Sequence, residues 1–216
     1  MIFVYGEKET GYLKSRDKAL SEAIDKIGHI HREVDVDLFS SVVRCIIGQL
    51  ISSAAGATLW SRMREKYGEV TAEAIARTDT AELQKVGMTF KKAEYIKAFA
   101  TKIVTGEFDL DALGSMSNEE VIREFCALKG IGVWTAEMIM IFCMQRPDVF
   151  SIGDLAIHRG LRMLYHHKNV DTRLFEKYRC RYSPYSTVAS LYLWAIAGGA
   201  IPGMQDSAPK KGRVVK

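Results

Sequence analysis

The most informative segment of the chain reads Leu128-Lys129-Gly130-Ile131-Gly132-Val133-Trp134-Thr135-Ala136. Apolar residues at helical spacing precede and follow it, which predicts that the segment joins two helices. Gly130 and Gly132, separated by one residue, permit a tight turn because glycine adopts backbone conformations that other residues avoid. We therefore predict a hairpin between two helices, with Ile131 directed into the joint between them.

Such a hairpin can bind an anion. At the start of its second helix the first backbone N–H groups have no partner within the helix, and the helix dipole favours negative charge there. These amides can hold a phosphate oxygen of a nucleic-acid backbone without reading its sequence. A plain helix-to-helix turn is the alternative. Half of a dinucleotide-binding motif is excluded, because Thr135 stands where a third glycine is required and no strand precedes the turn.

Helical spacing of apolar residues extends over nearly the whole chain, and only four prolines interrupt it. Asp37 and a Ser117–Glu120 capping box predict two helix starts, and Asp79 with Glu82 predicts a third. Helices are predicted over residues 12–27, 38–47, 54–67, 72–77, 80–86, 91–104, 118–127, 133–144, 155–165, 171–179 and 184–198. A short strand at Ile2–Tyr5 is the one exception. The predicted fold class is all-α, with about ten helices.

The composition excludes several classes of protein. The chain has 216 residues, of which 48% are hydrophobic and 26% charged, so it can build a core and is not intrinsically disordered. No stretch approaches the roughly 18 apolar residues of a membrane span, and the N-terminus does not resemble a signal peptide, so we expect a cytoplasmic protein. The four cysteines are far apart and the five histidines lack ligands at suitable spacing, so no metal site formed by side chains is expected.

A carboxylate follows the hairpin. Asp154 lies 22 residues after Gly132, beyond one helix and a loop and directly before the next predicted helix. Its local sequence favours a helix N-cap. The hairpin followed by this aspartate resembles the helix-hairpin-helix DNA glycosylase superfamily. The pattern Leu-x-Gly-Ile-Gly-x-Trp-Thr-Ala looks most like the alkylation-repair branch, the 3-methyladenine DNA glycosylase II type.

Other segments extend the resemblance to about residues 10–200. Ile46–Ser52 resembles the end of an early helix of the family, and Gly87–Glu94 resembles its central segment. Trp194 resembles an aromatic residue that the family places in its base pocket. The hairpin with its aspartate is the specific part of the pattern, and these segments support it.

The resemblance implies two helical lobes around a cleft, within a single domain that covers residues 1–204. One lobe is expected over about 38–150, and the other combines 1–37 with 151–204. The remaining residues, 205–216, form a basic tail that is expected to be disordered. This tail is interpreted as a solvated run of charges or as weak electrostatic help in binding a polyanion.

The resemblance implies a monofunctional DNA glycosylase that removes alkylated purines, with 3-methyladenine as the expected base. Relatives that also cleave the strand carry a lysine two residues after the second hairpin glycine, where this chain has Trp134. Base removal is therefore expected to leave an abasic site, with no lyase step and no cofactor. Asp154 would stabilise the oxocarbenium-like sugar and orient water, and helix capping does not exclude this role. The rivals are a glycosylase for an oxidised or deaminated purine and a non-catalytic helix-hairpin-helix module.

The resemblance also assigns residues to the damaged base. The base must leave the duplex to reach the site, and aromatic rings attract a cationic purine by stacking and cation–π contact. Trp134 and Trp194 are the candidates for this pocket. Met138 stands where the family often has an aromatic residue, which favours a smaller pocket suited to 3-methyladenine.

A further group of residues is expected to contact double-stranded DNA. Leu50 or Ile51 resembles the wedge that fills the gap left by the extruded base, and the sequence does not choose between them. Gln49 and Ser52 are candidates for contacting the opposite strand. The phosphate backbone is assigned to Gly130, Gly132 and Lys129.

The family often binds a monovalent cation through hairpin carbonyls, here Cys126, Leu128 and Ile131, so Na⁺ or K⁺ is expected there. A monomer is expected, associated with the nucleoid in a prokaryote or in the nucleus of a eukaryote. The tail supplies +3 of the net charge of +4, which leaves the rest of the chain near neutral. Affinity for DNA must therefore come from a localised face, formed by the hairpin amides and Lys129 with Lys91 and Lys92 as further candidates, and its dependence on salt should be modest.

Overall fold

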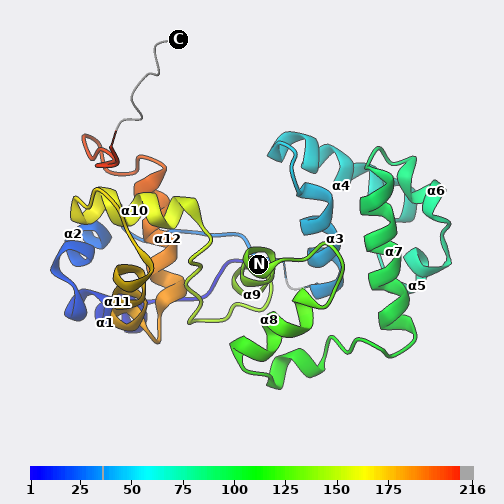
Figure 1. Cartoon of the computed structure of the whole chain (residues 1–216), viewed down its shortest axis with the longest axis horizontal. Coiled ribbons are helices and arrows are strands. Elements are labelled where there is room, and N and C mark those ends of the chain that lie inside the picture. Colours follow the sequence, from blue (N-terminus) through cyan, green and yellow to red (C-terminus); the bar gives the residue numbers. More distant parts are fainter. Residues whose placement is uncertain (36, 210–216) are drawn as a thin grey trace, which may run out of the picture. The chain divides into compact units, whose positions relative to one another are not determined.

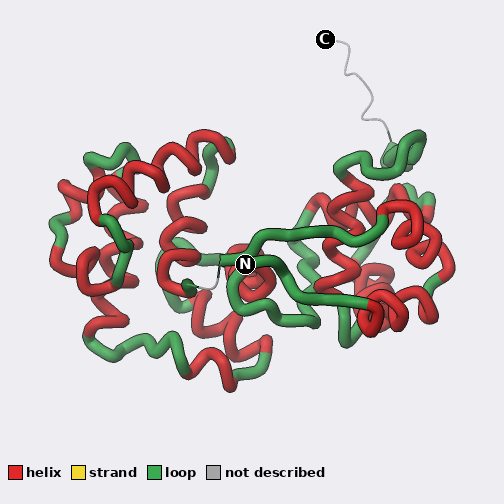
Figure 2. Tube along the Cα trace, turned by 180° about the vertical axis from the view of Figure 1, so that it is seen from behind, coloured by secondary structure: helices red, strands yellow, loops and turns green. Residues whose placement is uncertain are grey.

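The computed structural model describes residues 1–35 and 37–209. The described residues form twelve α-helices and one short 3₁₀ helix (Figures 1 and 2), which confirms the prediction of an all-α fold. The strand expected at Ile2–Tyr5 is reduced to a single bridge between Ile2 and Glu33. In the described part of the chain, no helix has the length and apolar character that crossing a membrane requires.

The helices follow one another along the chain with short connections. Their bounds are α1 Glu7–Arg16, α2 Lys18–Ile27, α3 Leu38–Gly48, α4 Ser53–Tyr67, α5 Ala72–Arg77, α6 Thr80–Gln84, α7 Phe90–Val104, η1 Ala112–Ser115, α8 Asn118–Cys126, α9 Val133–Phe142, α10 Leu155–Tyr165, α11 Thr172–Tyr182 and α12 Ser186–Ala197. The predicted caps at Asp37 and Ser117 are both present, with Asp37 accepting from the Ser40 amide and Ser117 from the Glu120 amide.

The helix predicted over residues 12–27 is two helices, which accounts for part of the difference from the expected ten. Asp17 leaves the helical conformation between α1 and α2, and its carboxylate accepts a hydrogen bond from the Leu20 amide at 2.9 Å. The apolar spacing on either side of Asp17 is helical, so periodicity alone did not reveal the break. An ion pair between the buried Asp17 and the partly exposed Arg181 ties this break to α11.

The chain forms two compact units. The first contains Met1 and Val34–Met144, and the second contains Ile2–Glu33 and the chain from Gln145 onward. The boundaries therefore differ by a few residues from the predicted 37/38 and 150/151.

Hydrogen bonds explain where the boundaries fall. The Asp35 amide donates to the Phe142 carbonyl at 3.0 Å, which places residue 35 in the first unit. Thr187, at the start of α12, donates its hydroxyl to the Arg146 carbonyl at 2.7 Å and accepts from the Val149 amide at 3.0 Å. The loop before Asp154 is thus held to α12 in the second unit.

A row of phenylalanine rings forms part of the core of the first unit. Phe39 of α3 stacks on Phe99 of α7 at 5.4 Å between centroids, and Phe99 contacts Phe108 edge-on at 5.7 Å. Phe108 in turn packs on Phe125 of α8 at 6.0 Å. All four side chains are buried, so α3, α7 and α8 share one apolar core.

The second unit is organised around α10 and α12, which lie side by side (Figure 1). Gly160 of α10 faces the backbone of Leu193 so closely that a Cβ atom there would overlap the Leu193 carbonyl. This close approach brings the beginning of α10 next to α12.

The last described residues, 205–209, are held to the second unit. Asp206 accepts hydrogen bonds from Nε and Nη2 of Arg162 on α10, both at 2.7 Å, and the bonded guanidinium lowers the pKa of the carboxyl. The prediction of disorder from residue 205 is therefore wrong for this part, because Asp206 has a partner 44 residues away. Residues 210–216, the rest of the predicted tail, lie outside the described residues.

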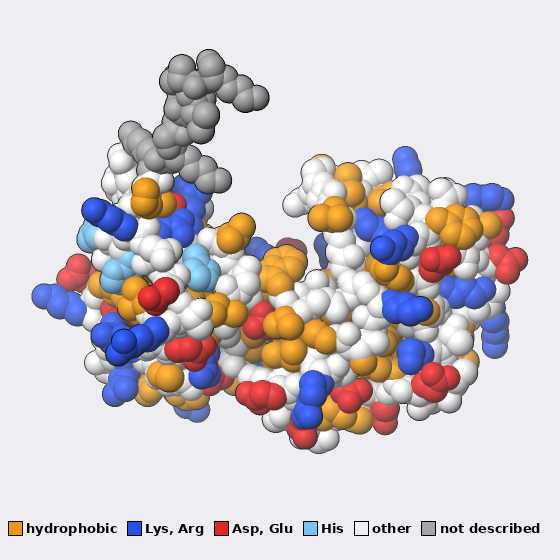
Figure 3. All heavy atoms as spheres, in the orientation of Figure 1, with side chains coloured by type: hydrophobic (Ala, Val, Ile, Leu, Met, Phe, Trp, Pro, Cys, Tyr) orange, Lys and Arg blue, Asp and Glu red, His pale blue; other side chains and the backbone are white. Residues whose placement is uncertain are grey.

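Basic side chains do not gather into one patch on the face of the molecule shown in Figure 3. On the face shown in Figure 3, basic and acidic side chains are interspersed on each unit. This distribution agrees with the small net charge and favours a localised contact with any polyanion over a broad basic field.

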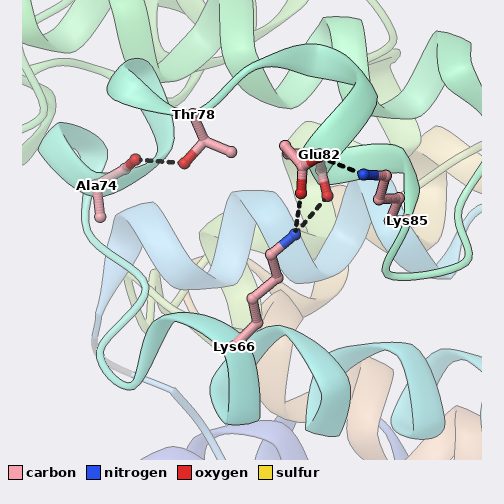
Figure 4. A network of polar contacts seen from close by, with 5 residues as sticks. All are labelled: Lys66, Ala74, Thr78, Glu82 and Lys85. Atoms are coloured by element: carbon pink, nitrogen blue, oxygen red, sulfur yellow. Dashed lines mark hydrogen bonds and ion pairs between the residues drawn. The ribbon is translucent and has the colours of Figure 1, made fainter.

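The start of α6 differs from the predicted cap. Asp79 makes no side-chain cap hydrogen bond within the described chain, and Glu82 does not turn back to it. Glu82 instead bonds Lys85 and also Lys66 of α4, the latter at 3.2 Å (Figure 4). These two ammonium groups lower the pKa of the Glu82 carboxyl, and they join α4 to α6.

Candidate functional site

The predicted hairpin is present between α8 and α9. Gly130 has φ +87°, and a Cβ atom at this position would overlap the ring of Tyr95 on α7. Glycine is therefore required at position 130 for both its backbone conformation and its lack of a side chain. Gly132 has φ −101° and open space around its Cα, so the structure does not require glycine at position 132 as strictly as at position 130. Ile131 is buried, as expected for a residue in the joint.

The second hairpin glycine starts α9 in a way that suits an anion. Gly132 is the N-cap residue, and it has no side chain with which to bond the amides of the first turn. Val133 and Trp134 in that turn are both about half exposed, at 51% and 49%. A helix N-terminus of this kind attracts negative charge through its dipole and its first N–H groups. Lys129, just before it, is exposed.

The turn between α3 and α4 contains the other residues assigned to DNA. Leu50 has φ +57°, a left-handed conformation that costs a non-glycine residue about 1–2 kcal/mol, and its side chain is completely exposed. Ile51 is 38% exposed and packs its Cδ1 toward Gly56. Ser52 caps α4 by accepting from the Ala55 amide at 3.3 Å. Of the two wedge candidates, Leu50 projects further into solvent.

This turn is bonded to the hairpin. Nε2 of Gln49 donates to the Gly130 carbonyl at 2.6 Å, across 81 residues of sequence. The two segments that sequence analysis assigned to DNA are therefore adjacent in the first unit. The side-chain amide of Gln49 thus bonds the hairpin in the DNA-free protein, and its contact with the opposite strand stays a prediction.

Asp154 lies at the beginning of α10 and caps it, as its local sequence predicts. One carboxylate oxygen, Oδ1, accepts from the amides of Ala156 and Ile157 at 2.8 and 2.9 Å. The same atom accepts from Nε1 of Trp194 on α12 at 3.2 Å. The side chain is 7% exposed within this structure. Three donors on one oxygen fix the direction of the carboxylate.

The loop that leads to Asp154 has its own support, which sequence analysis missed. His158, one helical turn after Asp154, places Nε2 2.8 Å from the Ile152 carbonyl and stacks on Phe175 at 5.0 Å. The spacing of four residues puts His158 on the same face of α10 as Asp154, and this spacing was the available signal. Two apolar residues close to Asp154 in the sequence, Ile152 and Leu155, have exposed side chains.

The predicted base-pocket residues are divided between the units. Trp194 is half-buried beside Asp154 in the second unit, whereas Trp134 belongs to the first. Met138 is only 8% exposed, in the buried middle of α9, and its place in the base pocket stays a prediction. Within the second unit, the structure brings Asp154 and Trp194 together through a hydrogen bond.

No side-chain metal centre is found among the described residues, where no three His, Cys, Asp or Glu side chains gather around a point. The four cysteines are free, and burial raises the pKa of the Cys45 and Cys143 thiols to about 11, which keeps both protonated and unreactive. At the hairpin, the Leu128 carbonyl accepts from the Ile131 amide at 3.2 Å. A cation bound by the carbonyls of Cys126, Leu128 and Ile131 stays a prediction.

Comparison with protein families places the hairpin and Asp154 within the match to a single family. The family described as the HhH-GPD superfamily of base excision DNA repair proteins matches residues 43–181, a span that contains both features. The chain belongs to this superfamily. Solved HhH-GPD relatives share its fold over nearly the whole chain. A DNA-3-methyladenine glycosidase from Bacillus halodurans is 31% identical, with a TM-score of 0.80 and coverage of 92% of each chain.

A second HhH-GPD structure is a 3-methyladenine DNA glycosylase of Schizosaccharomyces pombe, solved in complex with abasic DNA. It is 26% identical, with a TM-score of 0.77, and the match covers 88% of this chain and 97% of that one. By sequence, the chain is 28% identical to DNA-3-methyladenine glycosylase 2 of Escherichia coli, over 76% of this chain. It spans 59% of the length of that relative and 59% of a Bacillus subtilis relative.

Proposed function

We propose that this chain is a monofunctional DNA glycosylase that hydrolyses the N-glycosidic bond of alkylated purines, with 3-methyladenine as the principal base. The observation that carries the proposal is the carboxylate of Asp154, oriented by three donors on one oxygen, in a chain that also has the hairpin of the HhH-GPD superfamily. Relatives named as 3-methyladenine glycosylases support the choice of substrate.

The chemistry suits a single carboxylate. Methylation makes the purine cationic, so the bond from C1′ to the base nitrogen breaks with its electrons leaving on the base. The sugar then carries positive charge, which a nearby carboxylate stabilises. Asp154 also orients the water that adds to C1′, and it accepts the proton that the water loses. No cofactor is needed for these steps.

Trp134 and Trp194 have different roles in this proposal. Trp134 replaces the lysine amine that a strand-cleaving relative would use, so the abasic strand stays intact. Its ring is half exposed, and in this proposal it stacks on the extruded base. Trp194 directs its indole N–H at Asp154, so it orients the carboxylate in addition to lining the pocket.

The partner is double-stranded DNA that contains a damaged base. The amides at the start of α9 bind a phosphate, with Lys129 adding charge, and Leu50 enters the duplex as the base is extruded. We propose that a single chain acts alone on the DNA of the nucleoid, or of the nucleus in a eukaryote.

The test is base release from duplex DNA that contains methylated purines, by the wild type and by two variants at position 154. Asp154→Asn keeps the cap, because asparagine caps helices about as well as aspartate, so its thermal stability should stay near that of the wild type. Asp154→Ala should lose about 0.5–2 kcal/mol of unfolding free energy with the cap. Both should release base at least about 100-fold more slowly.

Separate outcomes would contradict separate parts of the proposal. Unchanged release by Asp154→Asn would exclude Asp154 as the catalytic group. Tight binding without release of any methylated, oxidised or deaminated purine by the wild type would indicate a binding module. Strand breaks that form without heat or alkali would contradict the monofunctional assignment.

A further inference from the structure

We propose that Lys92 is a positioning residue, which holds the turn between α3 and α4 in the conformation that projects Leu50. Its part in base extrusion rests on the proposed function. The holding contact itself is a property of the free protein and can be tested without DNA.

The contact is a lysine bound to the end of a helix. Nζ of Lys92 donates to the Ile47 carbonyl at 2.7 Å and to the Gln49 carbonyl at 2.6 Å. The last carbonyls of a helix accept no hydrogen bond from within that helix. The negative end of the α3 dipole also lies there and attracts a cation. Partial burial lowers the pKa of Lys92, as expected for an ammonium group that has left bulk water. Two of the three N–H groups of its ammonium donate hydrogen bonds to backbone carbonyls at the end of α3, so this side chain is bound to the turn.

The turn needs such support. Leu50 combines a left-handed backbone conformation with a fully exposed apolar side chain, and neither feature is favourable in isolation. Gln49, the residue before it, is held at two points. Its carbonyl accepts from Lys92, and its side-chain amide donates to the hairpin at Gly130. With Gln49 fixed in this way, the direction in which the chain enters Leu50 is also fixed.

Helix α7 therefore supports both DNA-directed segments of the first unit. Lys92 reaches the turn, and Tyr95, almost one helical turn later, covers Gly130 of the hairpin. The helix sets the spacing between the exposed leucine and the phosphate-binding amides before DNA arrives. Preorganisation of this kind lowers the entropy lost on binding, and it is most valuable where a stacked base must be displaced.

The chain offers a matched control in Lys97. This lysine lies on the same helix and donates its Nζ to the Thr78 carbonyl at 2.7 Å, at the C-terminal end of α5. Lys97→Met thus removes the same charge and the same kind of contact from α7, away from the turn. Lys92→Met and Lys97→Met are compared throughout.

The first measurement is amide hydrogen exchange in the DNA-free protein. Lys92→Met should speed exchange across residues 48–52 about tenfold and leave the core of α7 unchanged, whereas Lys97→Met should leave residues 48–52 unchanged. Lys92→Arg, which keeps a cation and several donors, should restore most of the protection. Unchanged exchange in Lys92→Met would overturn the proposal, whatever the enzyme does to DNA. If Lys92→Met does not fold, Lys92→Gln takes its place under the same criteria.

The second measurement links the turn to extrusion, by single-turnover base release from two substrates. One carries the lesion in a normal base pair, and the other carries it in a bulge, where it is already unstacked. Lys92→Met should slow release about tenfold on the paired lesion and less than threefold on the bulged one, and Lys97→Met should slow neither. Equal slowing on both substrates would overturn the role in extrusion. Absence of release by the wild type would contradict the proposed function instead and leave the exchange result standing.

Discussion

The N-cap residue of α9 is Gly132, which has no side chain to cap the helix, whereas the N-cap residue of α10 is Asp154, whose carboxylate accepts hydrogen bonds from the first amides of the helix. Both ends present amides and the positive end of a helix dipole. At α9 this arrangement leaves room for an anion from outside, such as a phosphate. At α10 the anion is the protein's own, and it is held in one orientation by α12 as well. In the proposed function, the same local feature thus serves binding in one unit and catalysis in the other.

The supports of the two ends also differ. The hairpin before α9 requires a residue without a side chain at position 130, because the ring of Tyr95 occupies the space that a Cβ atom would need. The site at α10 depends on an added donor, the indole N–H of Trp194. Substitutions in the hairpin should therefore act by changing its backbone geometry. Substitutions around the start of α10 should act by changing the orientation of the Asp154 carboxylate.

The largest effect should come from breaking the α9 end with a matched pair of substitutions. Gly130→Ala should lower the unfolding free energy by about 2–4 kcal/mol, from left-handed strain and from overlap with Tyr95. It should also weaken duplex binding more than about tenfold. Gly132→Ala should cost less than about 1 kcal/mol, because its Cβ meets open space. Urea unfolding and fluorescence anisotropy measure both. Equal losses in the two variants would show that the hairpin does not depend on Tyr95.

A smaller effect is expected when the α10 end loses its added donor. Trp194→Phe keeps an aromatic ring but removes the hydrogen bond to Asp154, so single-turnover release should fall about tenfold, or about 1.4 kcal/mol in the barrier. Binding to abasic DNA should change less than about twofold, because the phosphate contacts lie elsewhere. Trp60→Phe, at a buried position of α4, is the control and should leave the rate unchanged. A loss of binding without a loss of rate would assign Trp194 to stacking alone.

The smallest effect separates the two sources of positive potential at the α9 end. Lys129→Gln should reduce the slope of log K against log salt concentration by about 0.9, because one fewer phosphate counterion is released. Backbone amides are uncharged and therefore release no counterion when they bind a phosphate, so Gly132→Ala should leave the slope unchanged. Lys8→Gln removes an exposed lysine from α1 and serves as the control. If all three variants share one slope, Lys129 does not contact phosphate.

Signals carried by neighbouring residues predicted most of the fold correctly. Asp37 and Ser117 cap helices as expected, and the helix after Asp154 has the predicted bounds. Capping and apolar spacing act over three or four residues, so they are visible in the sequence. Asp79 shows the limit of the rule. Its expected partner Glu82 finds two lysines instead, one of them 16 residues away.

Of the candidate site, the hairpin and Asp154 could be found from residue types and spacing, whereas their supports could not. The side-chain amide of Gln49 bonds a carbonyl that lies 81 residues further along the chain, and its contact with DNA stays a prediction. The burial of Met138 within α9 could not be predicted either, and its place in the base pocket stays a prediction. Apolar residues lie on every side of α9, and such a helix gives no indication of which face is covered.

The sequence by itself determined the all-α class, the glycine hairpin, the aspartate at the start of α10 and the absence of a lysine at position 134. These depend on backbone preferences and on residue identity, both of which are local. The tertiary structure decided that Leu50 rather than Ile51 projects into solvent, that Lys92 and Gln49 hold its turn, and that Trp194 orients Asp154. Each of these depends on one backbone angle or on a contact between distant segments, and such contacts exist only once the helices have packed.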